Sequence, residues 1–174
     1  MPFEVTVGPV GQLTLARYTG PRLIVPQLRE RDAAGIISEL SQVLQREGCI
    51  ADMLPFYHTA LNHELLTNSA HESGFALPHG RLSGVKQLQF AFGRTPEPVI
   101  WGPKGSRPVH MVFLLAVPAT DAACYLHLLA SLARLGQQPV QLSALRHAAG
   151  PDGVLAILEQ IKIHASNSAA FPFG

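Results

Sequence analysis

The chain has 174 residues, of which 47% are hydrophobic and 14% are charged, and its formal net charge is +1. This composition is typical of a globular chain with a large core and excludes intrinsic disorder. Lys and Arg form no cluster, and the longest apolar run, 111–117, is far too short to span a bilayer. We therefore expect neither nucleic acid nor membrane insertion among its interactions.

The two cysteines, Cys49 and Cys124, stand far apart and lack the spacing of metal ligands or of a disulfide framework. The N-terminus also lacks the basic start and apolar run of a secretory signal. We therefore expect buried, reduced thiols in a cytoplasmic protein.

The first part of the chain predicts two helices after an extended leader. Glycine and proline recur through residues 1–22, where we expect one short strand at 12–18. Apolar residues then recur at helical spacing in 31–47 and again in 51–66. Both segments therefore predict amphipathic helices.

The middle of the chain predicts strands. A short strand at 75–77 leads into a turn at 78–81, and strict alternation at 87–92 predicts a half-buried strand. Prolines and glycines make 95–108 a predicted loop. Residues 109–117 are nearly all apolar, which predicts a central strand buried on both faces.

The last part of the chain predicts mainly helices. One helix should cover 121–135, with Asp121 as its N-cap and Gly136 just past its end. Three further elements are expected: a short strand at 139–142, a helix at 143–148 and a helix at 152–163. Because helices and strands interleave along the chain, the sequence predicts the α/β class.

Among eight histidines, His79 has a distinctive setting. Pro78 fixes φ and removes a backbone donor, and Gly80 lets the backbone approach a ligand. The short strand before this turn brings it to the edge of the sheet, where α/β folds place ligands, and Arg81 could hold an oxyanion. His79 is therefore a candidate functional residue, whereas each of the other histidines is assigned a structural or surface role.

Other familiar catalytic and metal motifs are missing from the sequence. No histidine or cysteine pair has the short spacing that zinc sites favour on one element, which leaves a metal site as a weak alternative. The serines near His79 lack the Gly-x-Ser-x-Gly pattern of a nucleophile. The glycines form neither a P-loop nor a dinucleotide fingerprint, so we expect no cofactor and no metal.

The segment from Gly74 to Arg81, Gly-Phe-Ala-Leu-Pro-His-Gly-Arg, resembles the active-loop signature of a known family. The family comprises the IIA domains of the bacterial phosphoenolpyruvate-dependent phosphotransferase system, of the fructose/mannitol type that includes nitrogen-regulatory IIA proteins. Further segments resemble the family in order and spacing: 52–64, 98–101, 107–118 and 126–135. The resemblance covers residues 25–163 and implies an α/β fold with a mixed central β-sheet flanked by helices on both sides.

The resemblance also implies a function. His79 would take a phosphoryl group from the phosphocarrier HPr, or its nitrogen-branch equivalent, and pass it to a IIB domain or use it to signal to a regulated protein. Imidazole suits this role because it is a neutral nucleophile near pH 7. The resemblance further implies one IIA-like domain over 1–174, with a flexible leader at 1–11 and a flexible tail at 164–174.

Around the active loop the chain departs from the family pattern. The helix before this loop usually ends in Arg-Glu, and His63 stands in place of that arginine, which lies near the phosphoryl site. Ser69 replaces a threonine, and Glu72 replaces a glycine and would bring a negative charge close to the site. Tyr125 replaces a second histidine, and His127 would face elsewhere because two residues turn a helix by about 200°.

Two functional hypotheses remain open. The first is a phosphocarrier or regulatory IIA protein with His79 as acceptor and His63, Ser69, Arg81 and Tyr125 around the phosphoryl site. The second is a regulatory or binding module with the IIA fold, whose phosphotransfer is weak or lost because His63 and Tyr125 replace the family residues. An arginine–phosphate hydrogen bond is worth roughly 1.5–3 kcal/mol, so its loss could slow transfer roughly 10- to 100-fold.

Overall fold

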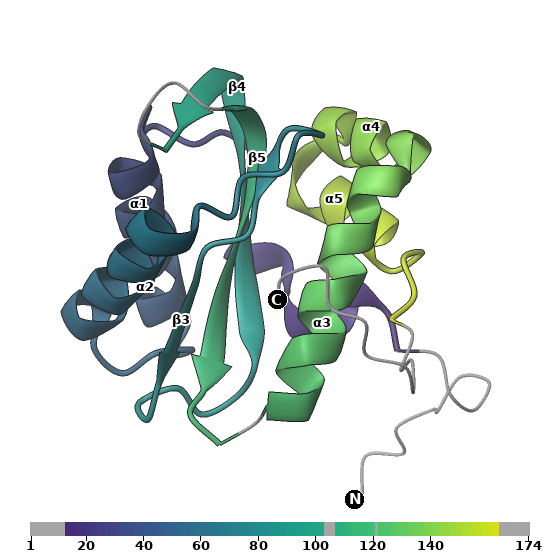
Figure 1. Cartoon of the computed structure of the whole chain (residues 1–174). Helices are drawn as coiled ribbons and strands as arrows, with labels where there is room; N and C mark the ends of the chain where they lie inside the picture. The colour runs from purple at the N-terminus through teal and green to yellow at the C-terminus, as the bar shows by residue number, and fades with distance from the viewer. Residues whose placement is uncertain (1–12, 103–106, 121, 164–174) are drawn as a thin grey trace, which may run out of the picture.

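The computed structural model describes residues 13–102, 107–120 and 122–163, and there a mixed β-sheet lies between two layers of helices (Figure 1). The strands are β1 (Ile24–Val25), β2 (Phe75–Ala76), β3 (His79–Leu82), β4 (Gln89–Trp101) and β5 (Arg107–Pro118). The helices are α1 (Ala33–Arg46), α2 (Met53–Thr67), α3 (Ala122–Arg134), α4 (Pro139–His147) and α5 (Gly150–Leu158). Short 3-10 turns are η1 (Leu15–Tyr18), η2 (Pro21–Leu23) and η3 (Leu135–Gln137).

The long strands β4 and β5 form an antiparallel pair in the middle of the sheet. β1 adds to β4 in parallel, and β2 and then β3 add to β5 in parallel. Val112 and Leu114 of β5 join the core beneath α1 and α2, whereas Phe113 and Leu115 join the core beneath α3, α4 and α5. The predicted central strand is thus buried on both faces, and the predicted fold class is confirmed.

The two predicted helices of the first half form close to their expected bounds because each has an acidic N-cap. The Asp32 carboxylate accepts the N–H of Gly35 at 2.7 Å at the start of α1. In α2, the buried side chains Phe56, Ala60 and Glu64 recur every four residues and face the sheet.

The prediction of a turn at 78–81 is wrong, because His79–Leu82 form strand β3. β3 pairs in parallel with β5, beginning with His79 opposite Leu115. Proline and glycine signal a turn locally, but the backbone groups of this segment bond to the edge of β5 that β2 leaves open. A long-range partner therefore overrides the local turn signal.

Other predicted elements also differ from the structure. Within the strand predicted at 12–18, residues 15–18 form the turn η1 instead, and a single bridge joins Thr14 to Lys162. Much of the predicted loop at 95–108 belongs to β4, whose register shifts between Arg94 and Val99 and so accommodates two prolines.

Two predictions near the end of the chain also change. Residues 139–142 start α4 instead of forming a strand, because Pro139 occupies the first helical position, where a missing N–H costs nothing. Gly136 lies in the turn η3 instead of ending α3 in a left-handed conformation. Cys49 is buried as expected, but Cys124 is exposed on α3.

Some predictions lie outside the described residues: the flexible leader and tail, and the N-cap role of Asp121. Within the described ranges, no helix is long and apolar enough to cross a membrane.

Candidate functional site

His79 is the first residue of β3, and its neighbours fix the backbone on either side of it. The Pro78 carbonyl accepts the N–H of Leu115 at 2.9 Å. A Cβ on Gly80 would lie 2.7 Å from the ring of Phe56, so only glycine lets α2 approach this closely. α2 therefore packs directly on the strand that carries His79.

The two ring nitrogens of His79 face different partners. Nδ1 lies 3.3 Å from the carbonyl oxygen of Leu77, and Nε2 lies 3.0 Å from the hydroxyl oxygen of Tyr125 on α3. Because a carbonyl oxygen can only accept, this pairing places the ring proton on Nδ1. Nε2 then keeps a lone pair, which accepts the Tyr125 hydroxyl.

The surroundings of His79 keep its ring neutral. Burial, followed by the charge of His63, lowers the pKa of His79 from 6.5 to about 4, against the opposing hydrogen bond to Leu77. Burial raises the pKa of Tyr125, although the charge of Arg81 acts in the opposite direction. At neutral pH the site therefore offers an uncharged imidazole beside a protonated phenol.

Two basic side chains flank this pair. The ring centroids of His63, on α2, and His79 are 4.1 Å apart. Arg81 is exposed, and its Nη2 donates to the carbonyl of Ala119 at 2.8 Å, which ties β3 to the segment leading into α3. The imidazole of His63 is thus packed against that of His79.

A chain of hydrogen bonds holds the backbone before His79. Glu64 is only 4% exposed, and its Oε1 accepts bonds from Trp101 Nε1 at 2.6 Å and from the backbone and hydroxyl of Ser69 at 2.8 and 3.0 Å. The Ser69 hydroxyl oxygen accepts the N–H of Leu77 at 2.9 Å. The Leu77 carbonyl in turn faces Nδ1 of His79. Ser69 therefore acts on the backbone that orients the histidine.

The turn before β2 places Glu72 away from the histidine. His71 pairs with Phe75 across this turn, so Glu72 occupies its exposed tip. The chain continues from this turn through β2 and Leu77 to His79. The charge of Glu72 is not among the causes that shift the pKa of His79.

The structure brings His63, His79 and Tyr125 into one cluster, while Ser69 is connected to it through a backbone segment. Sequence reasoning missed Glu64 and Trp101. Glu64 did carry a signal, because it is a lone carboxylate on the apolar face of α2.

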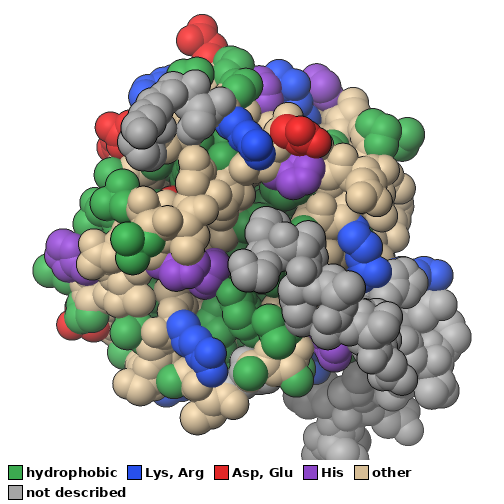
Figure 2. Space-filling model, in the orientation of Figure 1, with side chains coloured by type: hydrophobic (Ala, Val, Ile, Leu, Met, Phe, Trp, Pro, Cys, Tyr) green, Lys and Arg blue, Asp and Glu red, His purple; other side chains and the backbone are tan. Residues whose placement is uncertain are grey.

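No group of three His, Cys, Asp or Glu side chains in the described part of the chain could hold a metal ion. Lys and Arg side chains are scattered over the face drawn in Figure 2, with no continuous basic stripe. This face therefore gives no support to a nucleic-acid interface.

A neutral histidine at the start of an edge strand, in a mixed sheet covered by helices on both faces, is the arrangement expected of a IIA-type domain of a phosphotransferase system. The sequence agrees over most of its length. The chain belongs to the family described as "Phosphoenolpyruvate-dependent sugar phosphotransferase system, EIIA 2", which matches residues 18–161.

Individual relatives include both nitrogen-regulatory and sugar-specific proteins. The crystal structure of the nitrogen regulatory protein IIA-Ntr from Neisseria meningitidis is 30% identical, with a TM-score of 0.68, covering 83% of this chain and 98% of that one. The nitrogen regulatory protein of Bradyrhizobium diazoefficiens is 27% identical over 84% of this chain and 95% of its own length. The 2-O-alpha-mannosyl-D-glycerate-specific EIIABC component of Escherichia coli is 32% identical over 71% of this chain. The chain spans only 19% of that relative and 21% of the fructose-specific EIIABC component of Bacillus subtilis.

Proposed function

We propose that this protein is a phosphocarrier that accepts a phosphoryl group on Nε2 of His79 from HPr or its nitrogen-branch equivalent. The observation that carries the proposal is the pairing of the two ring nitrogens. Nδ1 faces the Leu77 carbonyl at 3.3 Å, which leaves the lone pair on Nε2. With a pKa of about 4, the ring carries no proton on that nitrogen at neutral pH.

The transfer step needs little from the protein except position. The Nε2 lone pair attacks the phosphorus of the phosphorylated donor, and the donor's P–N bond breaks with its electron pair returning to the donor nitrogen. The proton on Nδ1 stays on the ring and bonds to the Leu77 carbonyl, which stabilises the positive charge that develops on the imidazole. The Tyr125 hydroxyl must first release Nε2 and can then donate to a phosphoryl oxygen.

Onward transfer would follow the same chemistry in reverse, with a nitrogen or sulfur nucleophile of a IIB domain attacking the phosphohistidine. The resemblance to EIIABC components supports a IIB domain as the acceptor. The resemblance to nitrogen regulatory proteins supports a regulated target instead. In both cases His79 carries the group.

A second candidate function is a binding or regulatory module with weak phosphotransfer. Two observations favour it: the Tyr125 hydroxyl covers Nε2 at 3.0 Å, and His63 replaces the arginine usual in the family. Arg81 uses one N–H of its guanidinium for the carbonyl of Ala119.

Labelling with enzyme I, HPr and radioactive phosphoenolpyruvate tests the proposal. The wild type should gain one acid-labile phosphoryl group, and His79→Ala should gain none. His127→Ala is the matched control, because it removes a histidine of α3 that lies two residues from Tyr125 and should label normally. Equal labelling of His79→Ala and wild type would refute the proposal.

An unlabelled wild type would favour the second candidate function. In that case the double variant His63→Arg, Tyr125→His should acquire labelling, because it restores the family residues. Absence of labelling in this variant would show that the two replacements are not the cause.

A further inference from the structure

A second site lies beside the turn that precedes β2. Here a hollow of about 310 Å³ opens where this turn, the start of β5 and one side of α4 meet. Its walls are made by Ser73, Gly74, His110, Met111, Gly136 and α4, from which Leu142, Ser143, Arg146 and His147 face it. We propose that this hollow binds a small phosphorylated molecule and acts as an effector site for His79.

The charge of the lining fits an anion. Arg146, His147 and His110 are basic, and none of the lining residues is a carboxylate. His147 uses Nδ1 to bond the Ser143 carbonyl at 2.9 Å, so Nε2 is the nitrogen that faces a ligand and donates to it once the ring is protonated. Arg and His with a serine hydroxyl make up a donor set that suits phosphate oxygens.

Burial and the charge of Arg146 both lower the pKa of His110. The charge of Arg146 thus reaches His110 across the hollow and opposes protonation of its ring. A dianionic phosphoryl group between them would offset the charge of Arg146, raise the pKa of His110 and so favour the protonated ring, which can donate to it.

The walls are already held in place. Arg94 reaches from β4 to the end of α4, where Nη1 donates to the carbonyls of Leu145, Arg146 and Ala148 at 3.0, 3.1 and 2.7 Å. The Ser73 hydroxyl donates to the carbonyl of Gly136 at 3.0 Å, which joins the turn to the segment before α4. A ligand would therefore meet walls whose backbone is already held in place.

The size of the hollow limits the ligand. About 310 Å³ is at the lower end of small-molecule sites. Met111 and Leu142 give the hollow an apolar wall beside its basic one. These features fit a compact metabolite with one phosphoryl group and a short carbon body.

The turn connects the hollow to His79. Gly74 has a φ of 95°. Its carbonyl oxygen accepts hydrogen bonds from the N–H groups of His110 and Met111, at 2.7 and 3.3 Å. Three residues further on, Leu77 bonds Nδ1 of His79. A ligand that moves Gly74 along the strand would therefore change the orientation of the His79 ring. This regulatory role rests on the proposed function, whereas the binding itself does not.

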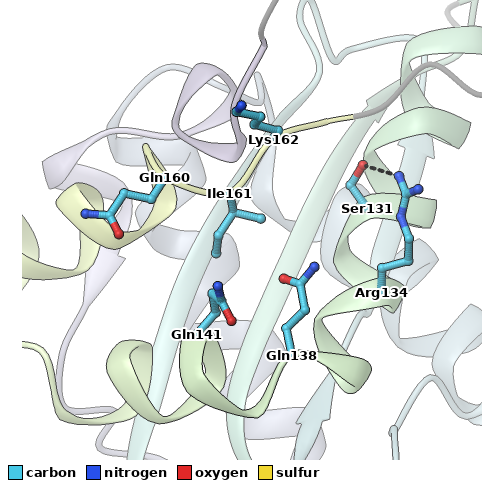
Figure 3. A pocket seen from close by; sticks show the side chains of 7 residues that line it. All are labelled: Ser131, Arg134, Gln138, Gln141, Gln160, Ile161 and Lys162. Atoms are coloured by element: carbon cyan, nitrogen blue, oxygen red, sulfur yellow. Dashed lines mark hydrogen bonds between the residues drawn. The ribbon is translucent and has the colours of Figure 1, made fainter.

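A second polar hollow serves as an internal comparison (Figure 3). It also has two cations, Arg134 and Lys162, among glutamine side chains. The Arg134 guanidinium is bonded to Ser131 at 3.3 Å, and in the view of Figure 3 it points along α3 instead of toward the glutamines. Arg134→Ala is therefore a matched control that removes an arginine charge from a different hollow.

Titration of the full chain with inorganic phosphate, followed through the imidazole proton signals in NMR, tests the site. The signals of His110 and His147 should shift together and saturably, and Arg146→Ala should weaken binding by roughly tenfold or more. Arg134→Ala should bind as the wild type does. Equal binding by Arg146→Ala, or loss of binding in Arg134→Ala, would overturn the site, and succinate in place of phosphate should shift these signals much less.

The regulatory role is tested separately by the rate of HPr-dependent labelling with and without saturating phosphate. The rate should change in the wild type but not in Arg146→Ala. An unchanged wild-type rate would overturn the coupling while leaving the binding result intact. A wild type that cannot be labelled at all would refute the proposed function of His79 and with it the regulatory role, but not the NMR titration.

Discussion

Replacing His79 with glutamine should remove a pH-dependent part of the protein's stability. The folded protein holds this imidazole neutral, with its pKa lowered from 6.5 to about 4, mainly by burial. Between these two values the unfolded chain binds a proton that the folded chain does not. The free energy of unfolding should therefore be highest above pH 6.5 and fall as the pH drops toward 4.

The size of the effect follows from the shift. Each unit of pKa difference corresponds to about 1.4 kcal/mol, so the full loss is roughly 3 kcal/mol, complete below the folded pKa. Part of the ring is accessible to solvent, which makes this figure an upper bound. The slope from this one group should not exceed about 1.4 kcal/mol per pH unit.

Urea unfolding at several pH values measures this, with the single tryptophan, Trp101, as the fluorescent reporter. His110 also has a lowered pKa, but it is present in both proteins and cancels in the difference between wild type and His79→Gln. This difference should shrink as the pH falls through the window. Parallel stability curves for the two proteins would refute the conclusion that His79 is held neutral by its surroundings.

Four further substitutions test the site. Gly80→Ala should lower the free energy of unfolding by about 1–3 kcal/mol in urea, because the new Cβ would meet Phe56. Gly20→Ala is the control, since a Cβ there meets open space and should cost little. Equal costs would contradict the close packing of α2. Ser69→Ala should leave the Leu77 N–H unpaired, which should lower the free energy of unfolding by about 1–3 kcal/mol and slow labelling. Ser69→Thr keeps the hydroxyl and should retain normal stability and labelling. Normal labelling of the alanine variant would exclude a positioning role for Ser69. Tyr125→Phe should take up label about two- to tenfold faster because the Nε2 lone pair is freed, and slower uptake would instead assign the phenol to the transition state. His63→Arg should speed labelling roughly tenfold or more, and an unchanged rate would show that the lost arginine is not limiting.

The elements that the sequence predicts well are those whose own side chains specify them. The apolar spacing of 31–47 and 51–66 already indicates which face of each helix is buried, and acidic caps fix where α1 and α2 begin. The apolar run at 109–117 also specifies its own role, because a strand with no polar face must be covered on both sides.

The elements that the sequence misses depend on distant partners. β3 forms because β5 has an open edge, a fact that no residue of 78–81 carries. β4 continues through two prolines because its partner strand tolerates a shift in register between Arg94 and Val99. Local turn signals are strong in both segments, and in both the unpaired backbone of a neighbouring strand outweighs them.

In the candidate site, too, the sequence predicts some residues and misses those that depend on distant partners. The local setting and the resemblance both predict His79 as a site residue, the resemblance alone predicts Tyr125, and the two side chains are in contact. The Trp101–Glu64 hydrogen bond joins residues 37 positions apart, so spacing along the chain could not indicate it. Ser69 was assigned to the phosphoryl site, but its hydroxyl bonds both Glu64 and Leu77.

In the proposed reaction, His63 and Tyr125 would act on different steps. The charge of His63 lowers the pKa of His79, as an arginine in the same place would, and the Tyr125 hydroxyl also opposes a proton on Nε2 by donating to it. Both replacements therefore preserve a neutral nucleophile. What the chain loses is donors for the phosphoryl oxygens, because a guanidinium offers five N–H groups and an imidazole at most two. The departures from the family pattern should consequently lower the stabilisation of the transition state and leave His79 ready to react. For this reason His63→Arg is expected to change the rate of labelling and not the protonation of His79.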